Sequence, residues 1–345
     1  MIMEDTRAVA DAGSSLTEVP GTPNSAARPA VLHFIASIDG GGAEAMLRSL
    51  VTRTDHQRWR VIVVAVDARS WPGATAFLKE HCDAFYDLES PKFLNRQTTS
   101  GLCRILRAEK PDLVQTWMHH ADLVGGVIAK LMGVRRVIWS IHCREIHRSP
   151  GDSELKSSLL KGALAIASRI VPDTIVSCSQ AAIEDHRKRG YPTKRMRWIP
   201  NGIDILRFQP NAKAWRNLPI IEHVHFLPFR PDPESLYPAM DVFTLTSRTE
   251  ACPMTVLEAM ACGVPCVTSD TGDCGLLLDG RGELVAPGDN HGFQKAWTRM
   301  LKLSRGSDDT LAKCLRQRVI DHFSIPRAAA AYQDLYAELV PSPQS

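Results

Sequence analysis

Short apolar runs alternate with helix-like stretches from residue 30 to about residue 205. The runs include AVLHFIAS (30–37), WRVIVVAVD (59–67), LVQTW (113–117) and RRVIWSIH (135–142), and most are followed by stretches with apolar residues three and four apart. Strands that are apolar throughout and alternate with helices are typical of a parallel sheet covered by helices on both faces. The pattern therefore predicts an α/β fold whose first domain spans 30–205.

The alternation continues beyond residue 205 in a shorter form. Further strands are predicted at 223–229, 242–247 and 265–270, and helices at 234–240, 253–263, 289–304, 307–322 and 326–339. Residues 1–29 are rich in Ala, Ser, Thr, Gly and Pro without an apolar period, which predicts disorder. The expected divisions are a disordered segment (1–29), a first domain (30–205), a second domain (206–325) and a C-terminal helix with its tail (326–345).

Composition excludes several classes of protein. The net charge of +3 is too small to indicate a nucleic-acid partner, and the longest apolar runs fall well short of a bilayer span. The N-terminus lacks a charged stretch followed by an apolar core, so no secretory leader is expected. Nine cysteines without a C-x-x-C pair favour free thiols in a reducing cytoplasm and no metal site.

Three glycines separate the first predicted strand from the helix that follows it. Gly40, Gly41 and Gly42 let the backbone approach an anion, and the helix start supplies unpaired N–H groups and the positive end of its dipole. The stretch GGGAEA also fits G-x-G-x-x-A, and Asp67 ends the second strand about twenty residues later, as in NAD(P)-dependent oxidoreductases. A phosphate-binding loop, a nicotinamide site and an ordinary turn all remain open from this stretch alone.

Two glutamates flank the start of the helix predicted at 253–263. Pro253 suits the first turn, so Glu250 lies just before the helix and Glu258 lies inside it. A ligand phosphate could rest on the free amides of Met254, Thr255 and Val256 while the two carboxylates bind hydroxyl groups on either side of it. A nucleotide sugar has this layout. A helix-start acid and a solvated helix position are the structural alternative.

The stretch from 247 to 289 carries a specific resemblance. SRTEACPMTVLEAMACGVPCVTSDTGD and the later GRGELVAPGD resemble the C-terminal signature of the family-four retaining glycosyltransferases of GT-B fold. GGGAE resembles that family's glycine loop, and DLVQTWMHHADLVGGVIAKLMGVRRVIWSIH resembles a branch found in bacterial polysaccharide clusters. The resemblance covers about 31–338 and implies two Rossmann-like domains that face a cleft. It leaves the nicotinamide enzyme as a distant alternative.

The resemblance also implies roles for the residues of the cleft. Glu250 would contact the hydroxyls of the donor sugar, Glu258 would contact the ribose, and the Gly40–Gly42 loop would approach the diphosphate. A hexose would be transferred from a nucleotide sugar to a glycan or lipid-linked acceptor with retention of its anomeric configuration. The reaction would need no metal or other cofactor. Exopolysaccharide or cell-envelope polysaccharide synthesis is the expected context. The expected location is the cytoplasm, with room for a peripheral contact at the inner face of the cytoplasmic membrane.

The sequence departs from this family where the donor phosphates should meet their cations. The family's Arg and Lys, about five residues apart after the first strand of the second domain, have no counterpart here. The chain passes from Pro219 directly to IIEHVHFLPF, as if roughly 60–80 residues, or two strand–helix units, were missing. Lys213 and Arg216 precede this junction, and Arg230 and Arg248 follow it. The second domain is therefore expected to be abbreviated, and a catalytically impaired homologue is the alternative function.

Histidines near the end of a first-domain strand are the remaining catalytic candidates. The family carries an acceptor-side histidine after this strand, where the present sequence reads QTWMHH. Simple counting aligns Trp117 with that position, and His119 and His120 follow two and three residues later. His142, at the end of the next strand, is a third candidate. A helix-capping or packing role is the alternative for each of them.

Overall fold

The computed structural model describes residues 28–38, 41–90, 93–144, 154–210, 227, 230, 232–304 and 309–341. The segment predicted to be disordered, 1–29, lies almost wholly outside these residues, as does the strand predicted at 223–229. Gly40 and the suspected junction at 220 also lie outside them.

A seven-stranded parallel sheet forms the N-terminal region. Its strands are β1 (Ala30–Ser37), β2 (Arg60–Asp67), β3 (Ala84–Asp87), β4 (Leu113–Trp117), β5 (Arg136–Ile141), β6 (Thr174–Ser177) and β7 (Met196–Trp198). They lie in the order β3-β2-β1-β4-β5-β6-β7, so the winding direction reverses between β1 and β4. In open sheets of this kind, ligands bind outside the carboxyl ends of the strands near that reversal.

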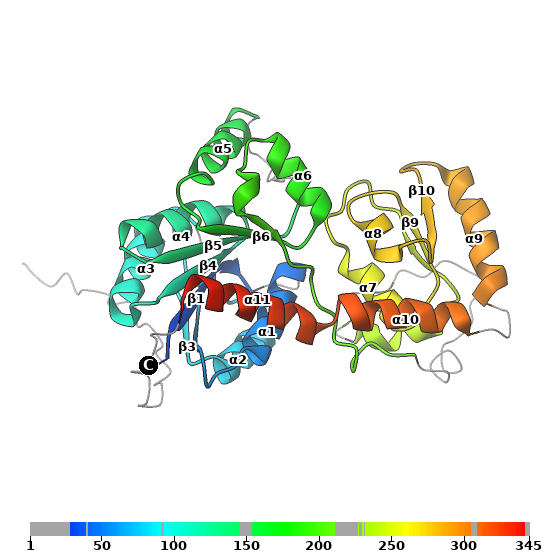
Figure 1. Ribbon diagram of the computed structural model, residues 1–345, viewed down its shortest axis with the longest axis horizontal. Helices are drawn as coiled ribbons and strands as arrows, with labels where there is room; N and C mark the ends of the chain where they lie inside the picture. Colours follow the sequence, from blue (N-terminus) through cyan, green and yellow to red (C-terminus); the bar gives the residue numbers. More distant parts are fainter. Residues whose placement is uncertain are drawn as a thin grey trace, which may run out of the picture.

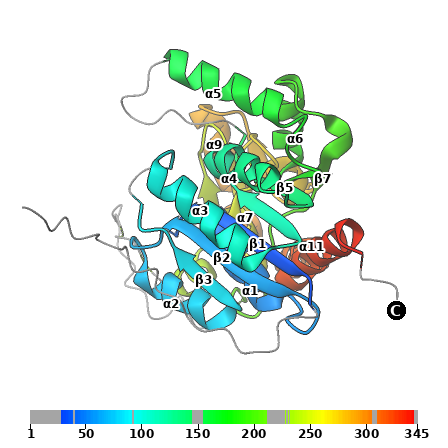
Figure 2. The same ribbon diagram turned by 90° about the vertical axis from the view of Figure 1, so that its left-hand side faces the viewer.

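Helices cover both faces of this sheet (Figures 1 and 2). They are α1 (Gly42–Arg53), α2 (Pro72–His81), α3 (Arg96–Glu109), α4 (His119–Leu131), α5 (Glu154–Ala167) and α6 (Gln180–Lys188). Helices α1 and α2 pack into one hydrophobic core, and α3, α4 and α5 pack into a second core on the opposite face. The Val- and Ile-rich strands β1 and β2 bury side chains in both cores, which explains why they read as continuous apolar runs.

A smaller sheet forms the C-terminal region. Within the described residues it has three parallel strands in the order β10-β9-β8, with bounds Phe243–Leu245 (β8), Cys266–Ser269 (β9) and Glu283–Val285 (β10). The helices are α7 (Met254–Ala261), α8 (Cys274–Leu278), α9 (Asn290–Ser304) and α10 (Thr310–His322). Helix α7 is the centre of the core here, because Val256, Leu257 and Met260 are fully buried.

The last helix, α11 (Ile325–Leu339), returns to the N-terminal region (Figure 1). Tyr332 and Tyr336 of α11 are buried in the same core as α1 and α2. The outgoing and returning segments meet where Ile203 N donates to Phe323 O at 2.6 Å and Ile325 N donates to Ile203 O at 3.0 Å. A side chain at Gly202 would lie 2.5 Å from Ile325 Cα, so this crossing requires glycine.

The predicted α/β fold with a parallel sheet is confirmed, with local corrections. The helix predicted at 234–240 is wrong: the segment forms two 3₁₀ turns, Pro233–Ser235 and Tyr237–Ala239, because Pro238 cannot donate a helical hydrogen bond. The short elements β3, α8 and β10 were not expected from the sequence. All nine cysteines are free thiols. No helix in the described part of the chain is long and apolar enough to cross a membrane.

Candidate functional site

The starts of α1 and α7 face each other across the two regions. A side-chain carbon added at Gly42, the first residue of α1, would lie 3.4 Å from Cγ of Met254, the first residue of α7. Neither helix has a side-chain hydrogen bond at its N-cap, Gly41 or Pro253. The N-cap side chains thus leave the first amides of these helices uncapped, and anion binding between the two helix starts stays a prediction.

The two helix starts differ in their surroundings. The Glu44 carboxylate lies directly against Gly41, where a Cβ would collide with it. The start of α1 therefore already carries a negative group, which offsets its dipole. No acidic residue lies in the first turn of α7. An anionic ligand would be held more favourably at the start of α7 than at the start of α1.

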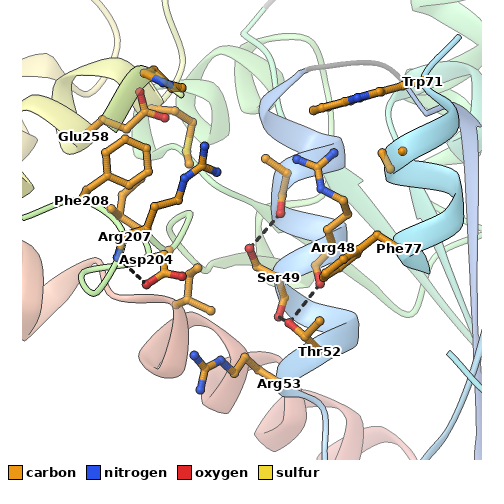
Figure 3. A pocket seen from close by; sticks show the side chains of 18 of the residues that line it. Arg48, Ser49, Thr52, Arg53, Trp71, Phe77, Asp204, Arg207, Phe208 and Glu258 are labelled. Atoms are coloured by element: carbon orange, nitrogen blue, oxygen red, sulfur yellow. Dashed lines mark hydrogen bonds between the residues drawn. The ribbon is translucent and has the colours of Figure 1, made fainter. Parts of the chain in front are cut away.

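A pocket of about 570 Å³ lies beside these helix starts, which is within the usual size of a small-molecule site (Figure 3). One wall comes from α1 and α2, and the other comes from the segment after β7, from α7 and from the first residue of α11. Its chemically distinctive lining residues are Arg48, Ser49, Trp71, Arg207, Arg230 and Glu258.

Glu258 reaches this pocket from α7. Its Oε2 accepts a 2.6 Å hydrogen bond from the hydroxyl of Tyr237, which is buried. Burial raises the pKa of Glu258, while the Tyr237 hydrogen bond and the nearby charge of Arg207 act to lower it. The carboxylate is thus fixed in orientation at the pocket wall, where it can accept hydrogen bonds from ligand hydroxyl groups.

Glu250 does not line the pocket. It lies in the loop before α7, and its carbonyl packs against Gly272, where a Cβ would collide with it. Among the predicted amide donors, Met254 lines the pocket, Thr255 is exposed and Val256 is buried in the core. The sugar-binding role of Glu250 stays a prediction.

The candidate histidines lie apart from the pocket lining. His119 is buried at the start of α4, with Nε2 3.3 Å from Nε2 of His186 and Nδ1 3.4 Å from the Cys143 sulfur. His120 is exposed and its ring lies 5.8 Å from that of Phe93. His142 stacks on the buried Trp117 at 5.2 Å, and burial lowers its pKa to about 4. The catalytic role of His119 and His120 stays a prediction.

Three of the pocket's arginines, Arg48, Arg53 and Arg207, were not among the residues predicted from the sequence. Arg48 comes from α1 and its guanidinium lies 4.6 Å from the centre of the Trp71 ring. Arg207 follows β7, and its Nη2 lies 2.8 Å from Oε2 of Glu234. Arg230, considered earlier, lines the pocket and pairs with Asp232 at 2.7 Å, whereas Arg248 is exposed outside the lining. Lys213 and Arg216 lie outside the described residues.

A sequence signal for Arg48 does exist. Ala45, Arg48, Ser49 and Thr52 are three and four residues apart, so they share one face of α1, opposite the apolar face that enters the core. A polar helix face that directly follows a glycine loop is a reasonable place to look for ligand contacts. The partner Trp71, however, lies on another element, and the sequence spacing does not place it.

Comparisons with known families divide the chain into the same N-terminal and C-terminal regions as the structure. Residues 40–207 match the family described as Glycosyltransferase Family 4, and residues 206–303 match Glycosyl transferases group 1. The chain carries two glycosyltransferase domains. The family boundary at 206–207 falls at Arg207, so the pocket and Glu258 lie where the two glycosyltransferase domains meet.

Curated relatives share only parts of these glycosyltransferase domains. The chain is 29% identical over 120 residues to an Escherichia coli UDP-Gal:alpha-D-GlcNAc-diphosphoundecaprenol alpha-1,3-galactosyltransferase, covering 33% of this chain and 30% of that protein. It is 33% identical over 148 residues to a D-inositol 3-phosphate glycosyltransferase of Corynebacterium jeikeium, covering 41% of this chain and 33% of that protein. The matched parts thus span about a third of these relatives' lengths.

Solved structures show the same fold at lower identity. Anabaena HepE, solved in complex with UDP, superposes with a TM-score of 0.73 at 17% identity and covers 89% of this chain and 99% of its own. A sucrose-phosphate synthase of Thermosynechococcus elongatus gives a TM-score of 0.71 at 18% identity, with coverage of 90% and 99%. These similarities establish the fold of glycosyltransferases of the GT-B type for the two domains.

Proposed function

We propose that this chain is a retaining glycosyltransferase that moves a hexose from a nucleotide sugar to a glycan or lipid-linked acceptor in bacterial polysaccharide synthesis. The observation that carries the proposal is Glu258, held by Tyr237 at the wall of a pocket beside the uncapped start of α7. The family matches and the relatives named for UDP-sugar chemistry support it. A peripheral contact with the cytoplasmic membrane would bring a lipid-linked acceptor to the cleft.

In this proposal the donor lies across the junction of the two domains. Its diphosphate rests on the first amides of α7, which lie next to the start of α1 and carry the positive end of the helix dipole. Glu258 accepts hydrogen bonds from the ribose hydroxyls, and Glu250 accepts them from the sugar. As the bond to the sugar breaks, negative charge grows on the departing diphosphate, and fixed positive groups accelerate that step.

A turnover assay tests the proposal. The full chain is incubated with UDP-, GDP- and ADP-sugars, with and without an acceptor mixture, and released nucleotide is measured beside the anomeric configuration of any product. We expect turnover with one nucleotide class, retained configuration, and a rate lower by about 10²–10³ in Glu250→Ala, the usual size for one lost contact in the transition state. Nucleotide binding by Glu258→Gln should weaken by about ten-fold.

The alternative is a catalytically impaired homologue, which the missing Arg and Lys stretch favours. It predicts nucleotide binding that depends on Glu258 without turnover of any nucleotide sugar. A chain restored with a family-like segment of about 70 residues after Pro219, the size of two strand–helix units, would then gain activity. Robust turnover by the unmodified chain would exclude this alternative.

A further inference from the structure

We propose that Arg48 and Arg207 bind the phosphate groups of the ligand between them, in place of the missing Arg and Lys stretch. The two side chains extend into the pocket from opposite walls, Arg48 from α1 and Arg207 from the segment after β7 (Figure 3). The anion site follows from this geometry. Its assignment to the diphosphate of a nucleotide donor rests on the proposed function.

Arg48 is held in place by Trp71, and one of its guanidinium nitrogens lacks a hydrogen-bond partner among the described residues. The face of its guanidinium lies over Trp71, which leaves the N–H groups in the guanidinium plane for other contacts. Its Nη1 is buried and has no hydrogen-bond partner among the described residues. A buried donor without an acceptor is costly, so an acceptor supplied by a ligand would remove this cost.

Arg207 completes the site from the other wall. Its pairing with Glu234 at 2.8 Å and the ring of Phe208 at 5.4 Å orient the guanidinium. Burial lowers the pKa of Arg48, and the charge of Arg207 lowers it further, although Glu44 acts in the opposite direction. Two cations that repel each other across a pocket are stabilised when an anion lies between them.

The charge of the lining points to an anionic ligand that also carries hydroxyls. Four arginines line the pocket, Arg48, Arg53, Arg207 and Arg230, against the carboxylates of Asp204 and Glu258. Glu234 and Asp232 pair with Arg207 and Arg230, whereas Nη1 of Arg48 has no hydrogen-bond partner among the described residues. A guanidinium fork matches phosphate oxygens in geometry, and Glu258 suits hydroxyl groups. A nucleoside diphosphate supplies both.

Calorimetric titrations of the full chain test this site. The ligands are inorganic pyrophosphate, uridine, UDP and GDP, and the proteins are wild type, Arg48→Gln, Arg207→Gln and the control Arg299→Gln. Arg299 is exposed on α9 and pairs with Glu283 at 2.6 Å, so its variant makes the same charge change far from the pocket. We expect each pocket variant to bind pyrophosphate and the preferred nucleotide about ten-fold more weakly, with the control unchanged.

Two further comparisons make the outcome decisive. Uridine carries no phosphate, so all four proteins should bind it equally. Arg48→Lys keeps the charge but loses the fork, so it should bind pyrophosphate with an intermediate affinity, which also covers the case in which Arg48→Gln fails to fold. Equal pyrophosphate and nucleotide affinities in wild type and Arg48→Gln would overturn the proposal, as would a wild type that binds neither ligand.

The turnover assay separates this inference from the proposed function. Pyrophosphate binding that depends on Arg48 without turnover of any nucleotide sugar supports the anion site and leaves the impaired homologue as the function. Turnover together with pyrophosphate affinities that are unchanged in both pocket variants supports the function and overturns the anion site.

Discussion

The carboxylate of Asp273 accepts a 2.9 Å hydrogen bond from the backbone amide of Gln180, so a residue of the C-terminal region caps a helix of the N-terminal region. The second carboxylate oxygen accepts from Ala181 N, also at 2.9 Å, and both amides belong to the start of α6. Ser179 caps the next amide of the same helix. The contact joins the two domains outside the pocket, because Asp273, Gln180 and Ala181 are absent from the pocket lining.

Replacing Asp273 by Ala should destabilise the protein. The two amides at the start of α6 would lose their acceptor in a partly buried place, which costs about 1–3 kcal/mol of unfolding free energy. Urea unfolding followed by circular dichroism measures the loss. The matched control is Asp309→Ala, since Asp309 precedes α10 without a side-chain cap hydrogen bond and should cost less than about 0.5 kcal/mol. Equal losses in both variants would contradict the capping role.

The hydroxyl of Tyr237 should matter for nucleotide binding. Tyr237→Phe removes the 2.6 Å hydrogen bond that orients Glu258, so we expect nucleotide affinity to fall several-fold and stability to fall by about 1 kcal/mol. Calorimetry and thermal unfolding provide the two readouts. Tyr332→Phe is the control, because the buried Tyr332 hydroxyl has no hydrogen-bond partner among the described residues and Tyr332 does not line the pocket. An unchanged affinity in Tyr237→Phe would show that Glu258 needs no support from this residue.

Substitution of Gly272 by alanine should destabilise the protein far more than substitution of Gly288. Both have positive φ, +57° and +86°, but a Cβ at Gly272 would also lie 2.6 Å from the carbonyl oxygen of Ala251. Gly288→Ala meets no atom within 4 Å, so only backbone strain of about 1 kcal/mol is expected. Gly272→Ala must also displace the loop that carries Glu250, and we expect a loss of at least about 2 kcal/mol. Urea midpoints of the two variants check the order, and similar midpoints would refute it.

The pair of His56 and Asp83 should make stability depend on pH. Nδ1 of His56 lies 3.2 Å from Oδ2 of Asp83, and this hydrogen bond raises the pKa of His56. A raised pKa means that the folded state holds the proton more tightly. The stability that the pair contributes is therefore complete below about pH 6.5 and is lost as the pH rises through the raised pKa. The stability difference between wild type and His56→Gln should therefore shrink from pH 6 to pH 9.

Asp83 should make stability depend on pH in a second range, at acidic pH. Although burial acts to raise it, hydrogen bonds from His56, Val61 and Arg28 lower the pKa of Asp83 to about 2. The stability that Asp83 contributes is present above its ordinary pKa of 3.8 and is lost as the pH falls toward 2. Asp83→Asn should remove both dependences, since it takes away the partner of His56. A variant with the same profile as wild type between pH 6 and pH 9 would contradict the assignment.

The sequence predicted the parts of the fold that rest on local pattern. Strands such as β1 and β2 are buried on both faces and therefore stand out as apolar runs, whereas β3 (AFYD) is a four-residue edge strand and was missed. The helix starts at Gly42 and Met254 followed from glycine and proline at helix ends, and the family resemblance implied that they face each other across a cleft. Arg48 was missed because its position depends on Trp71, 23 residues away on another element, and on a domain junction that no spacing reveals.

The return of α11 across the domain junction has a consequence for the order in which the chain can fold. The N-terminal core needs residues from α11, among them Ala328, Tyr332 and Tyr336, which a ribosome synthesises after the entire C-terminal domain. Domains usually fold as units as they emerge during synthesis. Part of one sheet face of the N-terminal domain therefore stays uncovered until residue 339 has been synthesised. The C-terminal domain is synthesised in full before the core of the N-terminal domain can be completed.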